Sequence, residues 1–164
     1  MKKLPFYHSK TVNWIIISGI FLSKFLAGTV LYIIYAYFYG DRDSADIFKY
    51  FDDGNIIYSS LSENPFDYFR IVTGIGADSP HLMNYYNTCD FWNKDFNYGL
   101  VNDNRIVIRF NALVRLISMG NIHIHTLFIS FLSFTGLWGI FKVFEGQFKN
   151  QKWGLLIMVF FLPS

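Results

Sequence analysis

The chain is poor in charge and in cysteine. Of its 164 residues, 16% are Asp, Glu, Lys or Arg, whereas 52% are hydrophobic and 21% are aromatic. An average soluble protein has roughly a quarter charged residues, so this composition argues against an ordinary soluble domain. The single cysteine, Cys89, excludes an internal disulfide. The net charge of +2 is too small and too scattered to indicate nucleic-acid binding.

Several catalytic patterns are also missing. No Cys/His or His/carboxylate spacing matches a zinc site, because His8 and His81 are remote from each other and from the pair His123 and His125. The sequence contains neither a glycine-rich phosphate loop nor a nucleophile elbow. We therefore assign no metal ligands and no cofactor, and a requirement for a divalent metal stays open.

Two long apolar runs are the strongest positive signal. Residues 13–39 contain one charged side chain, Lys24, and residues 122–144 form the second run. Each is long enough to cross a bilayer, which takes about 20 apolar residues. The first run is too long for a cleaved signal peptide and lacks a small-residue cleavage site, so we expect a retained anchor. A third run begins at Trp153 and is still short at Ser164, so we interpret the chain as the N-terminal fragment of a larger polytopic protein.

The distribution of charge predicts a topology. Lysines flank the apolar runs at residues 1–12 and 145–152, and the segment 40–121 carries eleven of the twelve acidic residues. Basic flanks stay in the cytoplasm. We therefore expect an all-α integral membrane protein of the bacterial inner (cytoplasmic) membrane, the N-terminal portion of a multi-span helical bundle. Its expected segments are a cytoplasmic N-terminus 1–12, transmembrane helix 13–39, extracytoplasmic loop 40–121, transmembrane helix 122–144, cytoplasmic loop 145–152 and the start of a third transmembrane helix 153–164.

The long loop is predicted to be ordered. Its many aromatic residues favour a packed or membrane-apposed layer. A helix is expected from Ser44 to about Leu61, ending before Asn64-Pro65, and residues 73–80 read as a turn. Residues 102–119 are expected to form an amphipathic helix along the membrane interface. Its apolar arc comprises Ile106, Phe110, Leu113, Val114 and Ile117.

Candidate catalytic carboxylates lie directly after the first apolar run. Asp46, Tyr50 and Asp53 fall at positions i, i+4 and i+7, so they share one helix face, which we expect to border open space. A carboxylate there is suited to act as a general base on an acceptor hydroxyl. Asp43 is a further candidate base, although its position also suits the N-cap of the helix, with Asp46 favouring the positive helix end.

Tyr50 and three basic residues are candidate substrate contacts. Arg105 and Arg109 lie where the chain returns to the membrane, and guanidinium groups bind phosphate bidentately. The alternatives are nonspecific contact with phospholipid headgroups or pairing with Asp103. Lys24 lies near the middle of the first run, where an ionisable group marks a polar site unless it snorkels to the interface.

Two segments resemble the C superfamily of membrane glycosyltransferases (GT-C). They are AGTVLYIIYAYFYGDRDSADIFKYFDDG and NDNRIVIRFNALVRLISMGNIHIHTLFISFLSFTGL. The resemblance implies a multi-helix membrane enzyme that takes a sugar from a polyprenyl-phosphate carrier, with a catalytic acid in the first external loop. Asp46 or Asp43 would be that acid, and Arg105 or Arg109 would contact the carrier phosphate. The adjacent Asp-Glu pair of protein mannosyltransferase relatives is absent, which leaves the identity of the base open.

The leading hypothesis is therefore transfer of a sugar from a polyprenyl-phosphate carrier to an extracytoplasmic acceptor in cell-envelope glycan synthesis. Lipid bilayer and further transmembrane helices of the same protein are the expected partners, with no nucleic acid, and the fragment alone should be inactive. The alternatives are a polymerase of lipid-linked polysaccharide repeat units, a transporter or flippase fragment that uses Lys24, and a small structural membrane protein.

Overall fold

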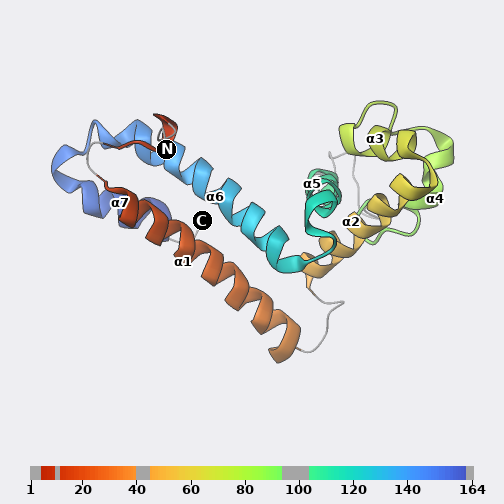
Figure 1. The fold of residues 1–164 in the computed structure, drawn as a ribbon, viewed down its shortest axis with the longest axis horizontal. Helices are drawn as coiled ribbons and strands as arrows, with labels where there is room; N and C mark the ends of the chain where they lie inside the picture. Colours follow the sequence, from red (N-terminus) through yellow and green to blue (C-terminus); the bar gives the residue numbers. More distant parts are fainter. Residues whose placement is uncertain (1–4, 10–11, 40–44, 94–103, 162–164) are drawn as a thin grey trace. The chain divides into compact units, whose positions relative to one another are not determined.

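The computed structural model describes residues 5–9, 12–39, 45–93 and 104–161, and these residues form helices and turns without a strand. The chain divides into two units (Figure 1). Unit 1 comprises Met1–Tyr32 with Thr126–Ser164, and unit 2 comprises Ile33–His125. The all-helical class expected from the sequence is confirmed for the described residues.

Two helices are long and apolar enough to cross a membrane. The first is α1 (Trp14–Ile33), which continues as the π-helical turn η2 (Ile34–Phe38), and the second is α6 (Ile122–Glu145). Only 11% and 22% of their most apolar windows are buried inside the molecule, so most of their apolar side chains face outward. This is weak support for a membrane location. The third apolar helix, α7 (Lys152–Phe161), is shorter.

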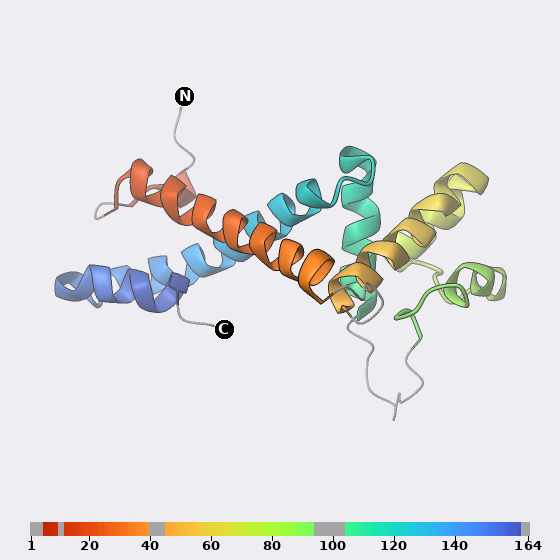
Figure 2. The ribbon, with the colours of Figure 1, turned by 90° about the horizontal axis from the view of Figure 1, so that it is seen from below.

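An aromatic core holds unit 1 together. Trp138 and Phe141 of α6 are fully buried and pack with Phe160 of α7 and with Ile17 of α1. The short helix η1 (Pro5–Tyr7) closes this core, since the Trp138 indole N–H donates to the carbonyl of Phe6 at 2.9 Å. Figure 2 shows the ribbon of α7 (dark blue) in a second view.

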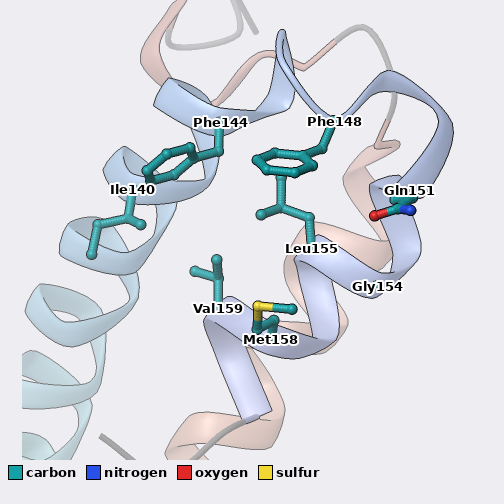
Figure 3. Close-up of a pocket in the computed structure, with 8 residues that line it drawn as sticks. All are labelled: Ile140, Phe144, Phe148, Gln151, Gly154, Leu155, Met158 and Val159. Carbon is teal, nitrogen blue, oxygen red and sulfur yellow. The ribbon is translucent and has the colours of Figure 1, made fainter.

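Helices α6 and α7 form a hairpin through the short helix η5 (Lys149–Gln151), and an apolar groove of about 310 Å³ lies between them. Figure 3 shows Ile140 and Phe144 of α6 on one side of this groove, with Leu155 and Val159 of α7 on the other. Its lining is mostly hydrocarbon, with Gln151 as the one polar side chain among the lining residues.

Unit 2 is a helical cluster built on the pair α2 (Asp46–Glu63) and α5 (Asn104–Ser118). Gly54 is the reason that these helices approach closely, because a Cβ there would lie 2.7 Å from the Cβ of Asn111. Helix α3 (Pro65–Thr73), η4 (Pro80–Leu82) and α4 (Met83–Tyr86) complete the cluster. The shared core contains Ile57, Tyr68, Ile71, Leu82, Tyr86, Trp92, Ile108 and Ala112.

Local sequence explains the break between α2 and α3. Asn64 is extended, its side chain accepts the N–H of Phe66 at 3.1 Å, and Pro65 occupies the first turn of α3. The end predicted before Asn64-Pro65 and the turn predicted over residues 73–80 are thus confirmed. The N-cap of α2 is Ala45, which offers no capping side chain, and Asp43, whose position also suited a cap, lies outside the described residues.

Candidate functional site

Asp46 is the predicted base that the structure leaves free. It is exposed at the first position of α2, and within the described residues its carboxylate has no hydrogen bond or ion pair. A negative charge at this position favours the positive end of the helix dipole. Asp43, the other candidate, lies outside the described residues.

Asp53 is buried, with 1% of its surface exposed. Its carboxylate oxygens accept the backbone N–H groups of Asp90 and Phe91, each at 2.8 Å. Burial raises the pKa of Asp53, and these two donors partly offset that rise. The prediction that Asp53 shares an open face with Asp46 and Tyr50 is therefore wrong. The segment that carries Asp90 and Phe91 covers this part of α2.

Tyr50 connects α2 to the start of α5. Its hydroxyl donates to Oδ1 of Asn104 at 2.9 Å, and its ring packs against Phe91 at a centroid distance of 5.1 Å. Asn104 is the residue next to Arg105, so this bond helps to fix the beginning of the helix that carries the arginines.

The two predicted arginines converge on one aromatic ring. The guanidinium carbons of Arg105 and Arg109 lie 5.3 and 5.4 Å from the centroid of Trp92. Trp92 is 1% exposed and stacks on Tyr86 at 4.4 Å, with an angle of 11° between the rings. Arg105 is also held by its Nε–H, which donates to the carbonyl of Trp92 at 3.0 Å. We call Trp92, Arg105 and Arg109 the arginine cluster.

Arg109 is the less satisfied member of the arginine cluster. Its Nε atom is buried and has no hydrogen-bond partner, and within the described residues its guanidinium forms no ion pair. Burial lowers the pKa of Arg109 and the charge of Arg105 acts in the same direction, whereas Tyr86 and Asp78 act against this shift. Gly74, at φ +80°, brings the end of α3 close to it, since a Cβ there would lie 3.3 Å from an Arg109 Nη atom. A partly buried cation without an anionic partner is costly.

Asp53 and the arginine cluster are joined through the backbone. The carboxylate that binds the N–H of Phe91 fixes the residue before Trp92. Asp53 therefore acts as a positioning residue in this arrangement. Among the described residues no contact joins Asp46 to either arginine.

Lys24 belongs to α1 and is half-buried in unit 1. Within the described residues no carboxylate and no tyrosine hydroxyl bonds to its ammonium group, although Tyr32 and Tyr35 follow it along α1 and η2. Its roles as a substrate contact or a transport residue stay predictions.

The sequence did not lead us to predict a polar site formed by Asp67 and His81. In unit 2 the Nε2 atom of His81 lies 2.9 Å from Oδ1 of Asp67, beside a groove that also contains Glu63 and Tyr85. The hydrogen bond to Glu63 raises the pKa of the Tyr85 hydroxyl to about 12. The available signal was Asn64 before Pro65, a preferred N-cap residue followed by proline at N1, which places Asp67 in the first turn of α3.

The described residues contain no group of three or more His, Cys, Asp or Glu side chains that would hold a metal ion. No protein-family model matches the chain, and neither a curated protein nor a solved structure matches it. The fold and the sites described above therefore define the class, an all-helical protein with two helices that meet the length and composition of membrane spans.

Proposed function

We propose that the chain is the N-terminal part of a multi-span glycosyltransferase of the bacterial inner membrane, with residues 40–121 on the extracytoplasmic side. It transfers a sugar from a polyprenyl-phosphate carrier to an extracytoplasmic acceptor in cell-envelope glycan synthesis. The further transmembrane helices of the enzyme complete the active site.

The observation that carries this proposal is the guanidinium of Arg109, which is partly buried and has no carboxylate in contact within the described residues. Such a cation is expected to bind an anion, and a phosphate group matches the planar donors of its terminal nitrogens. Arg105 lies over the same ring and adds a second positive charge. The lipid-linked phosphate of the carrier is the anion that a protein with two membrane-length helices would meet.

The outward face of α5 supports a lipid-borne substrate. Ile106, Leu113 and Ile117 are 70%, 45% and 66% exposed, and they lie on one face at helical spacing. This face matches most of the interfacial arc expected from the sequence, although Val114 is buried. An apolar face of this kind binds a membrane interface, and such binding would hold the arginines near lipid headgroups.

In the proposed reaction Asp46 removes the proton of the acceptor hydroxyl. The hydroxyl oxygen forms a bond to C1 of the sugar, and the bond between C1 and the phosphate oxygen breaks. The carrier phosphate leaves with that electron pair, and Arg105 and Arg109 stabilise its charge. Asp46 is exposed and forms no hydrogen bond within the described part of the chain, which is consistent with a group that meets substrate.

The test uses the full-length protein in membranes with polyprenyl-phosphate carriers bearing radiolabelled glucose, mannose or galactose. Asp46→Asn is expected to lower transfer by about 100-fold or more, the typical contribution of a general base. Arg109→Lys keeps the charge but loses bidentate binding, so we expect a weaker apparent affinity for the carrier. Asp90→Asn, a change at another exposed carboxylate, is the control.

Equal amounts of membrane-inserted protein must be compared. Full transfer by a well-inserted Asp46→Asn protein would remove Asp46 as the base and move the role to Asp43. Full transfer by variants at both positions would refute the carboxylate mechanism.

A further inference from the structure

Unit 2 contains a groove of about 530 Å³ that the proposed reaction does not use. It lies over α2, α3 and α4, and we call it the polar groove. Its polar lining includes Ser59, Glu63, Asp67, His81, Asn84 and Tyr85. These groups all come from elements of unit 2.

A fixed dyad occupies the polar groove. Asp67 is 5% exposed, and its carboxylate accepts the side-chain N–H of Asn64 at 2.9 Å and lies 3.7 Å from a guanidinium nitrogen of Arg70. His81 is half exposed, and its Nε2 lies 2.9 Å from Asp67. Because an ionised carboxylate only accepts, Nε2 carries the proton, and Nδ1 of a neutral ring is left as an acceptor.

Two other side chains have hydrogen-bonding capacity to spare. Asn84 is exposed, and within the described residues its amide forms no hydrogen bond. Glu63 accepts the Tyr85 hydroxyl through Oε2 at 2.7 Å, which leaves Oε1 without a partner among the described residues. The polar groove therefore presents one amide, one carboxylate oxygen and one imidazole nitrogen, together with the ring of Tyr85.

We infer that the polar groove binds a carbohydrate. Glu63 and Asp67 make the groove unfavourable for phosphates and other anions, because like charges repel. A neutral molecule with several hydroxyl groups instead donates to Glu63 and to Nδ1 of His81, and it both donates to and accepts from the Asn84 amide. The ring of Tyr85 and the side chain of Ile56 supply apolar surface for the C–H groups of a sugar.

The assignment of this sugar as the acceptor glycan rests on the proposed transferase function. Carbohydrate binding itself does not, because it follows from the lining of the polar groove. The two proposals can therefore fail separately.

The experiment is saturation-transfer NMR on the full chain in detergent micelles with glucose, galactose, mannose and N-acetylglucosamine as probes. We expect transfer from protein to at least one of these sugars. Asn84→Ala removes an exposed amide, and His81→Gln keeps a donor to Asp67 while it removes the ring acceptor. Each is expected to weaken binding about fivefold, the loss of one hydrogen bond. Asn87→Ala is the matched control, since Asn87 is exposed three positions further along and does not line the groove.

The inference would be overturned if no saturation is transferred from the protein to any of the four sugars. It would also be overturned if Asn84→Ala and His81→Gln leave sugar binding unchanged. Ethanolamine is the comparison ligand, and groove-dependent binding of ethanolamine without sugar binding would assign an amine site instead. Sugar binding in a full-length protein that lacks transferase activity would refute the proposed function and retain the carbohydrate site. Sugar transfer to the acceptor, without sugar binding that depends on the polar groove, would retain the proposed function and refute the carbohydrate site.

Discussion

Removal of the Asp53 carboxylate should release the segment that carries the arginine cluster. In the native structure this carboxylate is buried and accepts the N–H groups of Asp90 and Phe91 at 2.8 Å each. Hydrogen bonds to a charged group contribute about 1.5–3 kcal/mol each. The substitution also removes a buried charge, and the desolvation energy that is thereby recovered offsets part of the lost hydrogen-bond energy. We therefore expect Asp53→Ala to lower the local free energy of opening by about 3 kcal/mol.

The assay is amide hydrogen exchange of the full chain in micelles, followed for Asp90 and Phe91. A loss of about 3 kcal/mol corresponds to exchange that is about 100-fold faster at these two amides. Asn55→Ala, at an exposed position of the same helix, should leave both rates unchanged. Unchanged exchange in the Asp53→Ala protein would show that the carboxylate does not hold this segment.

The pH dependence of Asp53 has a definite sign. Burial raises the pKa of Asp53 above 3.8 in the folded protein, so the folded state retains this proton longer than the unfolded state does. The part of the stability that comes from the raised pKa is fully present below pH 3.8 and is lost as the pH rises through the folded pKa. As the pH rises over that range, the native protein should therefore lose free energy of unfolding relative to the Asp53→Asn protein.

Two further predictions concern packing and reactivity. Gly54→Ala places a Cβ 2.7 Å from the Cβ of Asn111, so we expect the free energy of unfolding, measured by heat or denaturant, to fall by about 2 kcal/mol. Gly19→Ala is the control, because a Cβ there meets nothing within 4 Å. Equal stability of the two variants would contradict this packing. Burial raises the pKa of the Cys89 thiol to about 12. Iodoacetamide at pH 8 should therefore alkylate Cys89 at least about 100-fold more slowly in the folded chain than in denaturant. Equal alkylation rates would contradict the burial of this thiol.

Helices with a local signal could be predicted from the sequence. The two membrane-length helices follow from apolar runs, and the break between α2 and α3 follows from proline at position 65 and the side chain of Asn64. The expected helix over 44–61 is observed as Asp46–Glu63, a shift of two residues at each end. The amphipathic pattern over residues 102–119 predicts the helix that carries the arginines at positions 105 and 109, and this helix is observed as α5.

The partners of buried polar groups could not be predicted, because they come from distant parts of the chain. Asp53 bonds to backbone atoms 37 and 38 positions away, and backbone donors have no sequence signature. Asp67 and His81 are 14 positions apart in separate elements. Helical periodicity places a side chain on a face, but it does not tell which segment covers that face.

Helix α5 illustrates the same limit and supports the membrane proposal. Its inward face combines the core residues Ile108 and Ala112 with polar groups, since Asn111 Oδ1 lies 2.8 Å from Nδ1 of His125 and Ser118 Oγ lies 2.7 Å from Nε2. The Asn111 amide donates to the carbonyl of Val107, so its oxygen must accept from Nδ1–H, and Nε2 then accepts from the Ser118 hydroxyl.

The side chains of Asn111 and Ser118 are thereby satisfied inside unit 2, whereas Ile106 and Ile117 point outward. Burial of such side chains stabilises a protein by about 1.5–3 kcal/mol each, and in water Ile106 and Ile117 do not gain this energy. The observed rotation gains that energy only where the outward face meets an apolar phase. A bilayer interface meets this condition, which is why the face of α5 is an argument for the lipid-borne substrate proposed here.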